Sequence, residues 1–302
     1  MRYRNALLFL ALSAIWGSAF AVIKAGLEYF PPVLFAALRY DVAGVLMLAY
    51  AAVAVDRWWP AGRAEWWVVG VGSVLMIAGY HAFLFVGEQY TTSAAAAVIV
   101  GLNPVLTTAF ARGLLPDERL TLVGVAGLLV GLAGVVVLAR PDPSNLLGGD
   151  AVGELLVFGA ALSFSLGSVL ARRSDADLPV ETMEAWSMLG GAVVMHGVSL
   201  ALAERPADVR VTTESVLALG YLAVVASALG FLIYFDLLDR LGPVEINLVS
   251  YAAPVAAAVT GFLLLAEVPT AATVVGFAAI LAGFVLVKRE AVRRELRRLG
   301  SE

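Results

Sequence analysis

The chain has 302 residues, of which 61% are hydrophobic and only 15% charged, and its mean hydropathy is +0.89. Because a soluble domain carries about 25% charged residues, this composition excludes a single water-soluble globule and predicts a protein surrounded mostly by lipid. The net charge of −4 argues against a nucleic-acid partner, and the absence of cysteine excludes disulfides, thiolate metal ligands and cysteine nucleophiles.

Apolar runs of transmembrane length follow one another along the whole chain. A helix needs about 20 apolar residues to cross the roughly 30 Å hydrocarbon core of a bilayer. The runs lack the two-residue alternation of a transmembrane barrel. They predict an all-α integral membrane protein with ten transmembrane helices, over residues 6–27, 33–55, 66–87, 91–111, 120–139, 151–171, 181–203, 215–238, 244–266 and 270–287.

The N-terminal stretch MRYRNALLFLALSAIWGSAFA has the two arginines, apolar run and small-residue Ala19-Phe20-Ala21 site of a signal peptide. Many further apolar runs follow it, so we interpret it instead as a retained first transmembrane helix.

Basic residues set the expected orientation, because cytoplasmic loops of membrane proteins are enriched in arginine and lysine. With the N-terminus in the cytoplasm, only Arg140, Arg205 and Arg210 fall in outside loops, and most others fall in inside loops. The sequence therefore predicts a multi-pass protein of the cell membrane with both termini cytoplasmic. The tail, residues 289–302, reads as a short basic helix that either anchors this orientation or binds anionic headgroups.

The chain also repeats itself. ALSAIWGS (11–18) aligns with ALSFSLGS (161–168) at a spacing of 150, as Pro104 does with Pro254. Glu118, Gly127 and Gly134 match Glu267, Gly276 and Gly283 at a spacing of 149. Residues 1–140 and 151–288 are thus predicted to be two five-helix repeats, inverted because five is odd. Such repeats place a substrate site at their interface near mid-bilayer and permit alternating access.

The matching prolines predict two broken helices. A proline inside a helix leaves a carbonyl without its donor, and in lipid such a carbonyl needs protein or water as a partner. Pro104 and Pro254 should therefore face the interior as kink or gating positions. Polar side chains adjoin both kinks and are candidate substrate ligands: Asn103, Asn247, Ser250 and Tyr251. The alternative is that the kinks improve packing and the asparagines join helices.

Charged and titratable residues within the spans are further candidates. Lys24 either extends to the outer headgroups or binds a substrate carboxylate or coupling ion. His81, beside Tyr80, either accepts a proton or joins two helices. We expect Arg39 to lie near the outer surface and to pair with Glu28 or Asp41.

Two remaining titratable groups carry weaker expectations. Glu88 is a third candidate for proton coupling, but as a residue at a helix end we expect it to be solvated. His196 has the same two interpretations as His81, with fewer polar neighbours in the sequence.

Aromatic and small residues fall into three groups. Trp16, Trp186, Tyr234 and Tyr251 are predicted to line a cavity, whereas Trp58, Trp59, Trp66 and Trp67 look like an interfacial belt. The runs GVAGLLVGLAG (124–134) and GFAAILAG (276–283) are predicted to be packing faces, because small residues let helix backbones approach closely.

Taken together, the motifs resemble the EamA-type members of the drug/metabolite transporter superfamily. The resemblance rests on AIWGSAFAVIKAGL, FAALRYDVAG, GEQYTTSAAAAVIVGLNPVLTTAFARGLLPDERLT and LGPVEINLVSYAAPVAAAVTGFLLLAEVPT, in this order. It implies a ten-helix carrier of small metabolites with a central cavity, to which Trp16, Tyr80, Asn103, Tyr234, Asn247 and Tyr251 would contribute. The second repeat departs from the first where LGSVLARRS replaces WGSAFAVIK, so the tryptophan contact would be one-sided.

The expected function is a secondary membrane transporter that moves a small organic metabolite, an amino acid or similar polar solute, more readily outward than inward. No G-x-x-x-x-G-K-[ST] loop is present, and no cofactor or metal site is expected. The predicted partners are this small-molecule metabolite and the lipid bilayer. An intramembrane enzyme and a channel-like facilitator are the alternatives.

Overall fold

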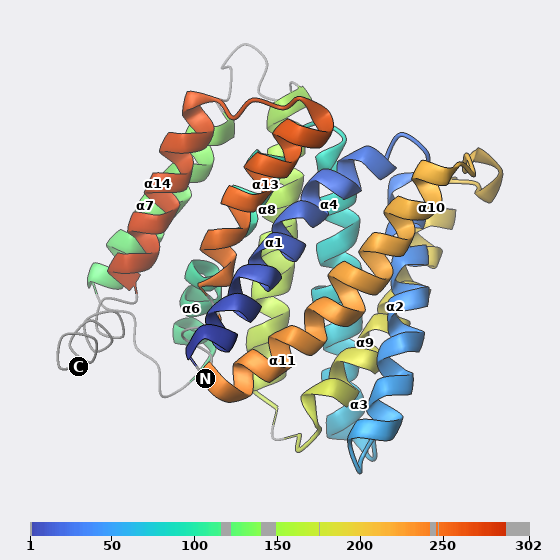
Figure 1. The fold of residues 1–302 in the computed structure, drawn as a ribbon. Coiled ribbons are helices and arrows are strands. Elements are labelled where there is room, and N and C mark those ends of the chain that lie inside the picture. Colours follow the sequence, from blue (N-terminus) through green and yellow to red (C-terminus); the bar gives the residue numbers. More distant parts are fainter. Residues whose placement is uncertain are drawn as a thin grey trace.

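The computed structural model describes residues 2–115, 122–139, 149–174, 176–241, 246 and 248–287. The predicted tail, Asn247 and Glu118 lie outside these residues. Within them the regular structure is entirely helical, and long helices lie side by side to form a bundle (Figure 1). The all-α prediction is confirmed for the described part of the chain.

The helices overlap the predicted spans closely, as expected from the continuous apolar runs. Their bounds are α1 (Arg2–Gly26), α2 (Pro32–Ala54), α3 (Arg63–Val71), η1 (Gly72–Gly79), α4 (Tyr80–Glu88), α5 (Ser93–Val100), α6 (Asn103–Leu114), α7 (Leu122–Ala139), α8 (Gly149–Arg172), α9 (Val180–Ala201), η2 (Pro206–Asp208), α10 (Thr213–Gly220), η3 (Tyr221–Leu229), α11 (Gly230–Leu241), α13 (Val249–Leu265) and α14 (Ala271–Val287).

Six helical stretches among the described residues are long and apolar enough to cross a membrane by length and composition. They are Tyr3–Gly26, Pro32–Ala54, Arg63–Glu88, Ser93–Leu114, Ala151–Arg172 and Thr213–Leu241. Shorter apolar helices cover Leu122–Leu138, Val249–Leu265 and Ala271–Val287. The protein is thus a multi-pass helical membrane protein.

Two of the long stretches contain a π-helical segment, in which backbone hydrogen bonds span five residues instead of four. These are η1 and η3, which begin at residues 72 and 221, a separation of 149. α-Helix directly precedes and follows each segment, so Arg63–Glu88 and Thr213–Leu241 each form one uninterrupted helical stretch. No sequence pattern predicted these segments.

The bundle has two ends, named here for the chain ends. α1 begins and α14 finishes at the same end, the terminal end; α1 finishes and α14 begins at the other, the distal end (Figure 1). Helices from the two halves of the chain pack together in pairs: α7 on α14, α2 on α9, α1 on α13 and α4 on α8.

Glycines bring α7 and α14 into backbone contact. A Cβ atom on Gly127 would lie 2.7 Å from the carbonyl oxygen of Gly283, and one on Gly134 would lie 2.8 Å from that of Gly276. Since real Cβ atoms do not approach so closely, only glycine fits at these positions. These contacts support the predicted packing role of both small-residue runs.

Tryptophans gather at the terminal end, where α2, α3 and α9 meet. The ring centroids of Trp59 and Trp186 are 4.6 Å apart, and the Trp186 indole N–H donates to the carbonyl of Trp58 at 3.0 Å. Trp66 contacts Trp186 as well, at 5.5 Å. The prediction that Trp186 lines the cavity is therefore wrong. Trp186 lies two turns into α9, level with the predicted interfacial belt, and forms part of that belt.

Gly283→Ala should destabilise the protein, because the added Cβ would meet the Gly127 carbonyl oxygen at 2.6 Å and the Gly131 nitrogen at 2.8 Å. Overpacking of this kind costs about 1–3 kcal/mol. The measurement is thermal unfolding of detergent-purified protein, followed by tryptophan fluorescence. Gly197→Ala is the matched control, since nothing lies within 4 Å of a Cβ there; equal melting temperatures for the two variants would contradict the packing assignment.

Candidate functional site

Trp16 connects α1 to the second half of the chain in the interior of the bundle. Its ring centroid lies 5.5 Å from that of Tyr234 and 5.8 Å from that of Phe231, both on α11. A Cβ on Gly230 would lie 2.7 Å from the indole nitrogen, so the glycine leaves room for the ring. Two predicted cavity residues, Trp16 and Tyr234, are thus brought together in one aromatic cluster.

Both π segments receive a hydrogen bond from a helix of the other half. The Trp16 indole N–H donates to the carbonyl of Ala226 in η3 at 3.1 Å. On the opposite side, the Ser163 hydroxyl of α8 donates to the carbonyl of Leu75 in η1 at 2.7 Å. A side chain therefore supplies a partner to a backbone carbonyl of each segment, as a lipid environment demands.

Arg39 is buried, with 6% of its surface exposed, and it reaches into the bundle. Its Nε donates to the Ser227 hydroxyl of η3 at 2.9 Å. The expectation that Arg39 pairs with Glu28 or Asp41 near the surface is wrong. Asp41 instead contacts His196: Oδ2 of Asp41 lies 2.8 Å from Nε2 of His196, and both side chains are about half exposed. The interpretation of His196 as a link between helices is the one this contact favours.

Ser18 provides a further polar contact between α1 and η3. Its hydroxyl lies 2.6 Å from the Tyr221 hydroxyl. Together with Arg39–Ser227 and Trp16–Ala226, this contact makes η3 the segment that receives polar groups from both α1 and α2.

Tyr80 and His81 begin α4 directly after η1. The Tyr40 hydroxyl lies 2.7 Å from Nε2 of His81, and Nδ1 lies 2.8 Å from the carbonyl of Ile77. Because a carbonyl only accepts, Nδ1 donates to Ile77. His81 therefore joins α2 and α4 through its hydrogen bond with Tyr40. Tyr80 faces α8, with its centroid 5.5 Å from Phe164.

The first predicted kink is a full break in the helix. α5 finishes at Val100 and α6 begins at Asn103, so Pro104 occupies the first turn of α6, where its missing N–H costs nothing. Pro104 is buried. The Asn103 side-chain oxygen is also buried and has no hydrogen-bond partner among the described residues. The Asn103 carbonyl accepts from the Ser165 hydroxyl of α8 at 3.2 Å.

The second predicted kink lies inside α13, where Pro254 is buried within a continuous helix. The Tyr251 ring lies 4.5 Å from Phe284 of α14, and its hydroxyl is buried without a partner in the described structure. A Cβ on Gly101 would lie 3.3 Å from the Ser250 carbonyl oxygen, so the break before α6 adjoins this turn of α13. The two proline regions thus meet inside the bundle.

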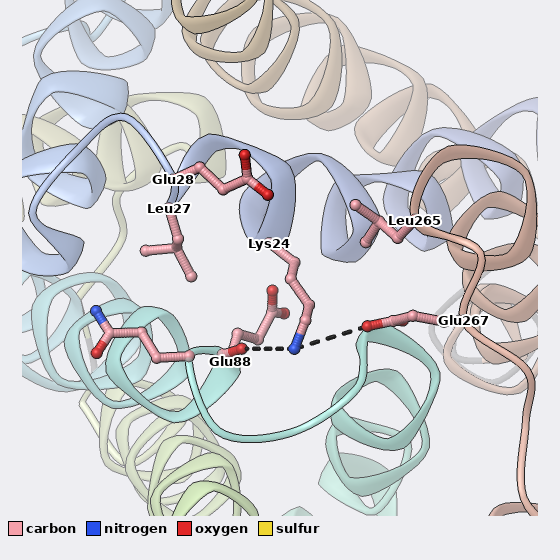
Figure 2. A pocket seen from close by; sticks show the side chains of 7 residues that line it. Lys24, Leu27, Glu28, Glu88, Leu265 and Glu267 are labelled. Atoms are coloured by element: carbon pink, nitrogen blue, oxygen red, sulfur yellow. Dashed lines mark hydrogen bonds and ion pairs between the residues drawn. The ribbon is translucent and has the colours of Figure 1, made fainter. Parts of the chain in front are cut away.

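A pocket of about 390 Å³ opens at the distal end (Figure 2). It is lined by Lys24, Leu27, Glu28, Glu88, Gln89, Leu265 and Glu267. The Lys24 ammonium donates to the carbonyls of Thr91 and, at 3.2 Å, Glu88, and lies 3.6 Å from Oε1 of Glu267. The Lys24 ammonium is thus bound by acceptors of the protein itself, on α4, before α5 and after α13.

Glu267 links three helices at this pocket. Its Oε2 accepts from the Ser93 backbone N–H at 2.9 Å and from the Ser93 hydroxyl at 2.6 Å. A carboxylate is stabilised there because the N-terminus of α5 carries positive partial charge. Glu267 follows α13, whereas Lys24 and Ser93 lie on α1 and α5. The carboxylate therefore ties the second half of the chain to the first.

Glu88 is the least expected residue of the pocket. It was predicted to be solvated, but it has no exposed surface. Neither carboxylate oxygen has a hydrogen-bond partner among the described residues. Figure 2 shows this carboxylate beside the Lys24 side chain, among the residues that line the pocket. The sequence showed that Glu88 is a carboxylate at the end of a helix. It did not show that α1 packs beside this side chain and buries it.

No group of three or more His, Cys, Asp and Glu side chains suited to a metal ion occurs within the described ranges. The polar groups that the structure does bring together are amides, hydroxyls, one guanidinium and the lysine and glutamate side chains of the distal pocket. They are suited to hydrogen bonding and to proton binding.

Apolar helices that enclose buried, partly unpartnered polar groups define a multi-pass membrane protein with a polar interior. The model of the EamA-like transporter family matches the chain twice, over residues 4–140 and 151–289. The chain belongs to this family and therefore has a role in membrane transport.

Relatives agree with this assignment. The chain is 32% identical over 272 residues to the uncharacterized inner membrane transporter YedA of Escherichia coli K12, covering 86% of this chain and 84% of YedA. It is 26% identical over 297 residues to the uncharacterized transporter YvbV of Bacillus subtilis, covering 98% and 95%. A protein of known crystal structure aligns with a TM-score of 0.64 and 28% identity over 96% of this chain and 99% of the other.

Ser227→Ala should destabilise the protein, because it leaves the buried guanidinium of Arg39 without its hydroxyl acceptor. Losing a hydrogen bond to a charged group costs about 1.5–3 kcal/mol. The double variant Arg39→Met, Ser227→Ala removes the charge too and should recover most of the loss. Thermal unfolding of the two variants measures this; a double variant no more stable than the single one would contradict the pairing.

Proposed function

We propose that the protein is a secondary carrier that moves a small polar organic solute by alternating access. In this proposal ten helices cross the membrane as two inverted five-helix repeats, residues 1–140 and 151–288. Three observations support it: the two family matches, the π segments that begin 149 residues apart, and the reciprocal contacts of Gly127 with Gly283 and Gly134 with Gly276. An inverted repeat brings its equivalent helices together in this manner.

The observation that carries the proposal is the pair of unpartnered polar groups where the proline regions meet. Buried polar atoms in native proteins nearly always have a hydrogen-bond partner. Among the described residues, the Asn103 amide oxygen and the Tyr251 hydroxyl have none, although both are buried. A polar solute that donates to Asn103 and accepts from Tyr251 would satisfy them. The cluster of Trp16 and Tyr234 lies on α1 and α11, and α1 packs directly against α13.

These partners suit a solute that both donates and accepts hydrogen bonds, such as an amino acid or a related neutral or zwitterionic metabolite. Tyr80, His81 and Ser250 are the further candidates, from the helices that border the same interior. Asn247, outside the described residues, stays a candidate on its sequence position. We infer transport out of the cell as the working direction, since members of the family often export metabolites.

Counterflow in liposomes tests the proposal. Purified protein is reconstituted with unlabelled solute inside and a labelled panel of amino acids and related metabolites outside. A carrier should accumulate the labelled form of its substrate transiently and show saturation. Flux without saturation or counterflow would indicate a channel, and covalent conversion of the solute would indicate an enzyme.

Asn103→Ala should reduce counterflow at least tenfold while leaving expression and thermal stability nearly unchanged, because the lost amide has no partner within the described protein to destabilise. A tenfold loss corresponds to about 1.4 kcal/mol of binding. Thr108→Val is the matched control on the same helix: its buried hydroxyl donates to the Pro104 carbonyl at 2.7 Å, within α6. Normal transport by Asn103→Ala would remove this residue from the site.

The proposed orientation places the distal end outside, as the distribution of basic residues indicates. The protein has no native cysteine, so single cysteines report sidedness cleanly. Ala207→Cys, in the exposed loop after α9, should react with a membrane-impermeant maleimide in intact cells. Ala61→Cys, exposed at the terminal end, should react only after the membrane is permeabilised. The reverse pattern would overturn the orientation.

A further inference from the structure

The distal pocket contains a carboxylate that the contacts around it do not explain. Glu88 is fully buried, and both of its side-chain oxygens lack a hydrogen-bond partner in the described structure. An ionised carboxylate taken out of water without donors is strongly disfavoured. The group therefore requires a partner that the described residues around it do not supply.

The space around the carboxylate limits what that partner is. The Glu88 oxygens have essentially no exposed surface, and the Lys24 side chain lies beside them (Figure 2). An organic ammonium or a hydrated metal ion would have to displace that side chain before reaching the oxygens. A proton needs no additional space.

Lys24 stands between two carboxylates that compete for it. Its ammonium lies 3.6 Å from Glu267, which is held in turn by Ser93 at the start of α5. With Glu88 neutral, Glu267 is the carboxylate that Lys24 contacts, and α1, α5 and the segment after α13 are joined. An ionised Glu88 would attract the same ammonium, and the link between the two halves would weaken.

The other groups around Glu88 are few. Arg39 on α2 and Tyr80 on α4 interact with it electrostatically, as do Lys24 and Glu267. α8 packs against α4 where Gly87 meets Gly153, and it carries the buried Glu154 next to that contact. Glu28 lies exposed at the rim of the pocket.

We propose that Glu88 is the proton-binding site that couples this carrier to a proton gradient, with Lys24 and Glu267 as the latch it controls. This inference rests on the proposed function and adds the coupling ion to it. In the latched state the Glu88 carboxyl holds its proton. When the O–H bond breaks, the proton passes to water in the pocket, the carboxylate draws Lys24 away from Glu267, and the distal end is released to open.

Spin-label distances across the pocket test the latch without any substrate. Cysteines replace Tyr90 and Val268, which are exposed on the two sides of the latch, in the full-length protein, which has no other cysteine. The double-labelled protein is placed in lipid nanodiscs, and the distance distribution is measured by pulsed electron paramagnetic resonance over roughly pH 4 to 10, a range that contains the ordinary and raised values of carboxyl groups.

The wild-type labels should show a short distance at low pH and a growing population of a longer distance as pH rises. Glu88→Gln, which mimics the protonated side chain, should keep the short distance at every pH. The matched control Glu28→Gln, a carboxylate at the exposed rim of the same pocket, should respond as the wild type does. A wild type that does not respond, or a Glu88→Gln variant that responds normally, would overturn the proposal.

Two additional variants keep the test decisive if Glu88→Gln does not fold. Glu88→Asp retains a titratable group and should keep the pH response with a shifted midpoint. Lys24→Met removes the ammonium for which the carboxylates compete and should abolish it; a response that survives in Lys24→Met would contradict the latch.

Infrared spectra provide an independent readout. The C=O stretching band of a protonated carboxyl group should be present in the wild type and in Glu28→Gln, and lost in Glu88→Gln. Counterflow at equal pH on both sides separates the two proposals. Wild-type counterflow without any pH response of the labels would reject proton coupling alone, whereas absent counterflow would reject the carrier itself.

Discussion

Inside a bilayer there is no water to bind a free backbone N–H or carbonyl, so each interruption of a helix needs a partner from the protein. The interruptions of this chain follow that constraint. The gap between α5 and α6 is buried and adjoins the proline turn of α13 through Gly101 and Ser250. The π segments receive donors from Trp16 and Ser163 on the other half. Because the interruptions lie inside, polar side chains collect in the interior, where we propose that the solute binds.

The two halves of the chain are held together in different ways at two places. Backbone contact between α7 and α14 leaves little freedom there, since glycines on both helices meet carbonyl oxygens of the other. The contacts at the distal end depend instead on side chains: Lys24 with Glu267, and Glu267 with Ser93. Ion pairs and hydrogen bonds of this kind exchange partners more readily than a close-packed backbone. In the proposed carrier, the close-packed α7–α14 pair would stay fixed while the exchangeable contacts at the distal end let that end open.

Apolar runs, prolines and glycines predicted most of the fold, because helix length and backbone geometry depend on local sequence. Local sequence did not predict which side chains of neighbouring helices contact one another. Position along a span suggested that Lys24 and Arg39 extend to the surface, but both turn inward to acceptors on helices distant in sequence. Glu88 looked solvated for the same reason. The π segments had no signal at all, since GSVLMIAG and YLAVVASAL contain no residue that demands a wider turn.

The central claim is that the two ends of the bundle open in alternation around this interior. Two label pairs in the same lipid environment test it most directly: Tyr90 with Val268 at the distal end, and Ala61 with Arg173 at the terminal end. Distances within both pairs are measured as solute and pH are varied. The account predicts that a longer distal distance always accompanies a shorter terminal one. Ends that lengthen together, or a terminal distance indifferent to the distal one, would contradict it.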